Sequence, residues 1–136
     1  MMHKVFEHWK EVPKTWAAWP WKYFSPKEVA CRGTGSLDID ESLLDHLELL
    51  RSNFGSTLTV LSAYRSKYHN ARVGGAVRSR HLFGDACDIS IVNKDRKLLE
   101  KLALEQGFTG FGYYNTFLHI DRRPKKASWG REKWNV

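Results

Sequence analysis

Two short segments, residues 86–91 and 117–121, most constrain the fold of this chain because apolar and polar residues alternate in both. Such alternation is typical of β-strands whose two faces meet different surroundings. The apolar face of the first segment holds Cys87, Ile89 and Ile91, and that of the second holds Leu118 and Ile120. The pattern therefore predicts two strands that carry Asp88 and His119 on their open faces.

A third polar residue, His81, precedes Asp88 by seven positions, with Gly84 between them. Glycine permits a tight turn, so this segment can double back and bring both side chains to one ion. Two imidazoles and one carboxylate are ligands that Zn²⁺ accepts, and three protein ligands leave a fourth tetrahedral position for water. The pattern is that of a catalytic zinc site at His81, Asp88 and His119.

A plainer interpretation of these residues needs no metal. A strand aspartate is costly to bury without a partner, but Arg65 or Arg80 could neutralise Asp88. A single histidine among apolar residues is more commonly hydrogen-bonded than metal-bound. The two cysteines, Cys31 and Cys87, are too far apart for a Cys-x-x-Cys clip, and we expect both to be free thiols. Spacing alone leaves the two interpretations open.

A family resemblance favours the metal. The pattern Ser79-x-His81-x-x-Gly84-x-Ala86-x-Asp88, followed by His119-x-Asp121, resembles the signature of the M15 zinc peptidases. This family comprises D-alanyl-D-alanine carboxypeptidases and L-alanyl-D-glutamate endopeptidases that act on peptidoglycan stem peptides. Residues 62–66 and 69–75 resemble the Tyr-Arg-Ser and His-Asn…Val-Gly-Gly stretches of compact phage and prophage members. The likeness runs from about residue 24 to 121. It implies one Zn²⁺ held by His81, Asp88 and His119.

The resemblance also implies residues that contact substrate. Arg65 is expected to bind the substrate or stabilise negative charge on the scissile carbonyl, since a fixed cation beside a metal does both. Ser79 is expected to line the same cleft, although it could simply cap a helix. His69 is expected either to line the cleft or to pack within its own helix.

The resemblance does not by itself identify the general base. Many relatives keep an acidic residue three positions before the last ligand, but Thr116 occupies that position here and accepts a proton poorly. Asp121 is our candidate, because it shares a strand face with His119 and follows it by two residues. The alternative roles for Asp121 are to orient an imidazole or to pair with a neighbouring arginine. Asp85 is a weaker candidate for the base.

The remaining sequence predicts an α+β fold, with N-terminal helices and a small, mainly antiparallel sheet that carries the metal site, as in the hedgehog and DD-peptidase scaffold. A capping box at Ser25 and Glu28 predicts a helix start. The other expected helices cover residues 40–54, 67–72 and 95–105, and the other expected strands cover residues 57–62, 108–113 and 116–122. We expect one domain over residues 1–136, because a chain of this length can bury a core without disulfides.

The two ends of the chain have distinct compositions. Residues 1–24 hold four of the six tryptophans, namely Trp9, Trp16, Trp19 and Trp21. Such a segment is expected to pack across the core through its large apolar area, although flat aromatic faces could instead stack on glycan rings. Residues 123–136 are rich in lysine and arginine, and the default expectation for them is a solvated basic tail.

Net charge and hydropathy limit the kinds of partner that this chain is expected to bind. A net charge of +7 suits an anionic target such as the cell wall, and the chain has no recognisable nucleic-acid module. No apolar run reaches membrane-spanning length and no secretory signal is visible, so we expect no membrane insertion. The expected protein is a monomer made in the bacterial cytoplasm that reaches the wall through a holin or as part of a virion.

These observations predict a zinc peptidase that cuts an amide bond in peptidoglycan stem peptides, as a phage or prophage lytic enzyme. Two alternatives stay open. The hedgehog signalling domain resembles the same scaffold, so a non-catalytic zinc domain is one, and Thr116 keeps it open. A wall-binding or virion module without zinc is the other. The sequence does not distinguish a carboxypeptidase from an endopeptidase.

Overall fold

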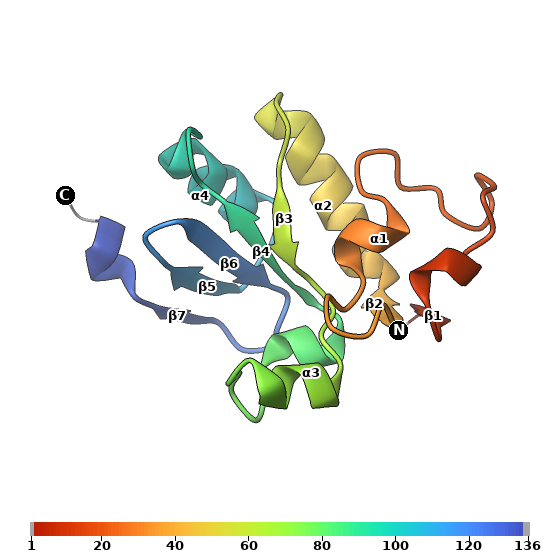
Figure 1. The fold of residues 1–136 in the computed structure, drawn as a ribbon. Coiled ribbons are helices and arrows are strands. Elements are labelled where there is room, and N and C mark those ends of the chain that lie inside the picture. Colours follow the sequence, from red (N-terminus) through yellow and green to blue (C-terminus); the bar gives the residue numbers. More distant parts are fainter. Residues whose placement is uncertain (1, 135–136) are drawn as a thin grey trace.

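A five-stranded sheet and two helices form the centre of the computed structural model, which describes residues 2–134. The strand order is β3-β4-β6-β5-β7, and the bounds are Val60–Ser62 for β3, Ala86–Ser90 for β4, Phe117–Asp121 for β6, Gly110–Tyr113 for β5 and Ala127–Trp129 for β7. Neighbouring strands are antiparallel except β5 and β7, which are parallel. Figure 1 shows the helices α2 (Glu41–Phe54) and α4 (Arg96–Glu105) together behind this sheet. The predicted α+β class is confirmed.

The register between β4 and β6 fixes the two faces of the sheet. Asp88 lies directly opposite His119, while the next pair, Ile89 and Leu118, is fully buried. Paired residues in adjacent strands point to the same face of a sheet. The alternation in the sequence therefore places Asp88 and His119 together on the face that is turned away from α2 and α4.

The helix α2 supplies much of the core behind the sheet. The carboxylate of Asp40 accepts a hydrogen bond from the Ser42 amide at 2.8 Å, which caps the first turn. Gly55 ends the helix with a φ of 80°, a left-handed conformation that suits glycine. The apolar stripe of the helix consists of Leu43, Leu44, Leu47 and Leu50, all completely buried. The predicted helix over residues 40–54 is confirmed.

Shorter helices position the segments around the sheet. The helix α1 (Pro26–Val29) begins with the predicted capping box of Ser25 and Glu28. The helix α3 (Lys67–Arg72) lies where the sequence predicts it, and α4 begins after its cap Asp95. Two 3₁₀ turns, η1 (Trp9–Glu11) and η3 (Arg131–Trp134), lie near the two ends of the described residues.

The loop before β4 contains a third 3₁₀ turn, η2 (Arg80–Phe83), which carries His81. Gly84 ends this turn with a φ of 69°, and a Cβ at that position would lie 2.2 Å from the Asp38 carbonyl oxygen. Only glycine fits so close to another backbone. The predicted turn at Gly84 is thus confirmed, and it fixes the entry of the chain into β4.

The sequence did not predict three of the strands, β1, β2 and β7. A separate two-stranded sheet pairs β1 (His3–Phe6) with β2 (Leu37–Asp40), both of which are only four residues long. The segment expected as a solvated basic tail instead adds β7 to the sheet edge and buries Trp134 to 4% exposure. Short strands with charged residues carry little periodic signal, because only long-range pairing stabilises them.

Only part of the tryptophan-rich segment packs across the core as expected. Trp19 and Trp21 are buried, and their indole N–H groups donate to the Phe24 carbonyl at 2.7 Å and to Asp45 at 2.9 Å. Trp16 is 68% exposed. Packing across the core therefore describes only part of this segment.

None of the helices in residues 2–134 has the length and apolar character needed to cross a bilayer.

Candidate metal centre and cleft

Three potential metal ligands meet on the open face of the sheet. His81 comes from η2, Asp88 from β4 and His119 from β6, and their exposed fractions are 4%, 8% and 6%. Asp88 Oδ1 lies 3.2 Å from His81 Nε2 and 2.9 Å from His119 Nδ1. The three donor atoms all lie within 4.8 Å of one another. The predicted set thus converges on one point.

Hydrogen bonds on the far side of each ring determine which nitrogen faces this point. His81 Nδ1 lies 2.7 Å from the carbonyl oxygen of Ala63, which only accepts, so Nδ1 carries the hydrogen. His119 Nε2 lies 2.7 Å from Asp121 Oδ2, so in the neutral ring Nε2 donates to that carboxylate. Each neutral imidazole therefore presents its lone pair to Asp88.

This arrangement fits a divalent cation. Two nitrogen lone pairs that face a carboxylate oxygen repel it unless a proton or a cation lies between them. A tetrahedral Zn²⁺ with ligands at about 2.0–2.1 Å separates its donor atoms by about 3.3 Å, close to the two distances above. The donor set of two imidazoles and one carboxylate suits zinc. The residues of this structure thus fit the predicted ion.

Charge within the cluster supports the same arrangement. Burial disfavours ionised Asp88, but hydrogen bonds from His119 and His81 outweigh burial and lower its pKa to about 2. Burial also opposes protonation of His119, yet Asp121 and Asp88 together raise its pKa above the usual value. At neutral pH the cluster therefore has an ionised carboxylate, and a metal competes with protons for His119.

Asp121 supports His119 from inside the protein. Its side chain is completely buried, and Arg123 donates to it from the backbone amide at 3.1 Å and from Nη2 at 2.6 Å. Burial opposes ionisation, but the bonds from His119 and Arg123 hold the pKa of Asp121 well below its usual range. A Cβ at Gly110 would lie 2.0 Å from Asp121 Oδ1, so glycine makes room for this carboxylate.

Trp129 forms a wall of the same site. Its ring centroid lies 5.1 Å from that of His119, and the Arg123 guanidinium lies 5.1 Å from the Trp129 centroid. The indole N–H donates to the Tyr114 hydroxyl at 2.9 Å. Trp129 therefore packs on one ligand and closes that side of the site.

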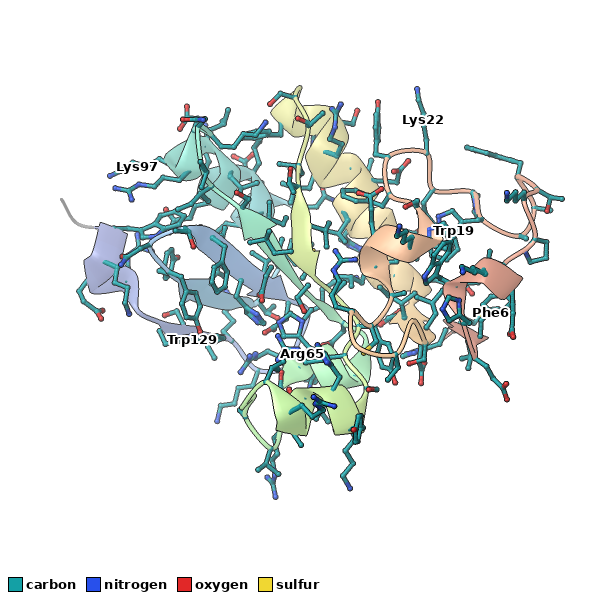
Figure 2. All side chains as sticks on the ribbon, viewed as in Figure 1. Phe6, Trp19, Lys22, Arg65, Lys97 and Trp129 are labelled. Atoms are coloured by element: carbon teal, nitrogen blue, oxygen red, sulfur yellow. The ribbon has the colours of Figure 1, made fainter. Side chains whose placement is uncertain are left out.

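A cleft of about 480 Å³ opens beside the three potential ligands. Its walls are formed by Arg65, Gly74, Gly75, Ala76, Arg78, Ser79, Arg80, His81, Asp88, Tyr114, Phe117, His119, Arg123 and Trp129. Asp88 is the only carboxylate of the lining in the part of the chain that the structure describes. Figure 2 shows the labelled side chains of Arg65 and Trp129 on the side of the sheet near α3.

Arg65 lies in this cleft without an acidic partner among residues 2–134. Its Nη1 donates to Asn70 Oδ1 at 3.0 Å and its Nη2 to Ser62 Oγ at 3.4 Å. The ion pair with Asp88 that the sequence left open does not form. Neutral partners hold the guanidinium in place and leave its charge free for an anionic ligand.

Ser79, Asp85 and His69 occupy different places. Ser79 lines the cleft and also caps η2, since its hydroxyl accepts from the His81 amide at 3.3 Å. Asp85 pairs with Arg80 and is absent from the cleft lining as described. His69 is absent as well, and its ring lies beside Gly33.

Sequence reasoning overlooked Trp129 and Arg78, and it gave Arg123 only a generic ion-pair role. Trp129 belongs to the strand that was expected as a tail, so no local pattern pointed to it. Arg78 is exposed in the glycine-containing loop after α3. For Arg123, the spacing of two residues from Asp121 was a usable signal, because alternate residues of an extended chain share a face.

Comparisons with known proteins find similar sequences. Residues 22–121 match a family model described as Peptidase M15. The chain is also 35% identical over 80 residues to the zinc D-Ala-D-Ala carboxypeptidase of Streptomyces albus G. That alignment covers 54% of this chain and 31% of the relative, so the chain spans about a third of the relative's length.

We expect the wild-type protein to bind one Zn²⁺ and Asp88→Asn to bind it more than about 100-fold more weakly, because the variant removes a charged ligand. Binding should also weaken as the pH falls through the raised pKa of His119, since a protonated ring has no lone pair to offer. Competition titration with a chromogenic chelator measures both effects. Asp38→Asn, which changes a half-exposed carboxylate paired with His3, is the control. Unchanged zinc binding by Asp88→Asn would contradict the site.

Proposed function

The chain belongs to the peptidase M15 family, and from that premise we propose that it hydrolyses an amide bond in the stem peptides of bacterial peptidoglycan. The family match and the zinc carboxypeptidase relative confirm the class predicted from the sequence, a zinc metallopeptidase. The observation that carries the proposal is the convergence of His81, Asp88 and His119 at the floor of a cationic cleft.

His81, Asp88 and His119 are the residues that would hold the metal. When bound, zinc would polarise the scissile carbonyl and make a water molecule more acidic. The chain's own residues prepare that chemistry, because the Ala63 carbonyl and Asp121 fix the rings in the orientation that turns one nitrogen of each into the cleft. Trp129 covers one side of His119 and limits the access of bulk water.

Arg65 is the proposed anchor for the substrate. A stem peptide ends in a carboxylate and carries others along its length, and the guanidinium is the natural partner for such a group. Arg65 has hydrogen bonds to Asn70 and Ser62 but no ion pair, so a substrate carboxylate does not have to displace a protein carboxylate. Ser79, which lines the same cleft, is proposed to contact the substrate as well.

For Asp121, the contacts support the orienting role over that of the general base. Both of its oxygens already accept hydrogen bonds from His119 or Arg123, and it does not border the cleft as described. We therefore propose that Asp121 holds His119 in the correct tautomer, while its role as a base stays a prediction to be tested.

The proposed biological setting rests on the charge of the chain. The net charge of +7 suits a phage or prophage enzyme that acts on an anionic wall after release by a holin or delivery in a virion. The protein is proposed to act as a monomer, without membrane insertion or a nucleic-acid partner, since one chain supplies every residue of the cleft described here.

Digestion of purified sacculi tests the proposed activity directly. Zinc-loaded wild-type protein should release soluble fragments, and Asp88→Asn should release none. Mass spectrometry of the products identifies the bond, since a carboxypeptidase removes one terminal D-alanine and an endopeptidase separates L-alanine from D-glutamate. A protein that binds zinc but releases nothing would instead be a non-catalytic member of the family.

Arg65→Ala should lower kcat/KM for a soluble stem peptide by about 100-fold, the typical cost of removing a charged contact to substrate or transition state. The zinc affinity should stay within a factor of about two, because the Arg65 side chain bonds to Asn70 and Ser62, and the variant keeps the backbone bond from Arg65 to the His81 carbonyl. Arg72→Ala, on the exposed side of α3, is the matched control and should keep full activity. Equal kcat/KM for Arg65→Ala and wild type would remove Arg65 from substrate binding.

Asp121→Asn separates the two roles considered for Asp121. The orienting role predicts zinc affinity about 10–100-fold weaker and recovery of kcat at saturating zinc. The base role predicts normal zinc affinity and a kcat that stays low at any zinc concentration. Asp85→Asn removes another buried arginine pair that touches no imidazole, and it controls for simple loss of stability.

A further inference from the structure

The mechanism makes no use of a second cavity, which lies in the N-terminal segment. It measures about 350 Å³ and is lined by Trp9, Lys10, Val12, Pro13, Lys14, Thr15, Trp16, Trp19, Ser25, Pro26 and Lys27. It shares no lining residue with the catalytic cleft. Figure 2 shows Trp19 beside α1, on the opposite flank of the molecule from Trp129.

The walls of this cavity are aromatic and firmly held. Trp19 is 8% exposed, and its indole N–H donates to the Phe24 carbonyl. The turn that carries Trp16 is closed by a hydrogen bond from the Trp19 amide to the Thr15 carbonyl at 3.1 Å. Trp16 itself is 68% exposed, although burial of a tryptophan stabilises a protein strongly. An exposed indole beside an apolar hollow is a candidate binding surface.

Charge narrows the class of ligand. Lys10, Lys14 and Lys27 line the cavity, and no carboxylate does so among the described residues. The ammonium groups of Lys10 and Lys27 lie 5.6 Å and 5.4 Å from the centroid of the Trp9 ring. A second copy of this chain would bring the same lysines and a net charge of +7, which disfavours self-association here. The occupant should combine an apolar face with negative charge.

We infer that this cavity binds a glycan strand built from N-acetylated sugars, with carboxylates on lactyl groups that lack a peptide or on the attached stem peptides, as a second site of contact with the wall. The carbon–hydrogen face of a sugar ring would stack on Trp16, an acetyl methyl group would enter the apolar hollow, and the lysines would pair with the carboxylates. The inference rests on the proposed function, since it places such a glycan close to the stem peptides that the catalytic cleft would cut.

Binding of soluble glycan strands tests the inference. Strands released from sacculi by an amidase carry free lactyl carboxylates, and their affinity for the full zinc-loaded protein can be measured by calorimetry. Trp16→Ala should weaken binding by about tenfold or more, as expected for loss of an aromatic anchor. Hydrolysis of a soluble stem peptide should not change, because Trp16 is remote from the catalytic cleft. Equal binding by Trp16→Ala and wild type would overturn the site.

The lysines are tested with a charge-matched pair of variants. Lys10→Gln/Lys14→Gln should weaken strand binding by about threefold, while Lys97→Gln/Lys101→Gln on α4 should leave it unchanged. Chitotetraose, a neutral strand, should bind more weakly than the charged strands and should not respond to salt. Equal losses in both double variants would overturn the assignment of an anionic ligand to this cavity.

Two further results would distinguish failure of the glycan site from failure of the proposed peptidase activity. A wild-type protein that hydrolyses no stem peptide, yet binds strands through Trp16, would refute the proposed function and support the site. Dimerisation that Trp16→Ala abolishes, measured by light scattering and without strand binding by the wild type, would overturn the site in favour of a protein interface.

Discussion

The cross-strand pair of Asp88 and His119 is the interaction on which the rest of this structure depends. The two residues face each other in adjacent strands, with Asp88 Oδ1 and His119 Nδ1 2.9 Å apart. A shift of β4 by one residue would turn Asp88 into the apolar core and bring Ile89 to the cleft. The buried apolar neighbours in β4 and β6 therefore hold the polar pair in place.

The second requirement is control of the imidazole rings. Burial alone does not fix the tautomer of a histidine. Here the Ala63 carbonyl accepts from His81 Nδ1, and the Asp121 carboxylate accepts from His119 Nε2. Arg123 in turn neutralises Asp121, which would otherwise be an unpaired buried charge. The chain of contacts from Arg123 through Asp121 to His119 therefore holds the ring in a set orientation before any ligand arrives.

The sequence predicted much of the fold and the three potential ligands. Capping residues and the leucine stripe located α1 and α2, and alternation located β4 and β6, because these signals depend on residues close together in the chain. The same reasoning missed β1 and β2, which pair across a long stretch of sequence, and β7, which is an edge strand. It also could not assign the contacts of Asp121, because strand parity says which face a residue occupies but not which nitrogen of a neighbouring ring it meets.

By itself, the sequence identified which residues could hold a metal, since two histidines, an aspartate and a turn glycine occur in an order that resembles the M15 signature. Only the tertiary structure decided how the residues around that set are used. It left Arg65 without an acidic partner in the cleft, placed Asp121 behind His119, brought Trp129 from the last strand against the same ring and left Trp16 exposed beside a separate hollow. The physical reason is that charge pairing, exposure and ring contact depend on distances between segments, and packing sets those distances.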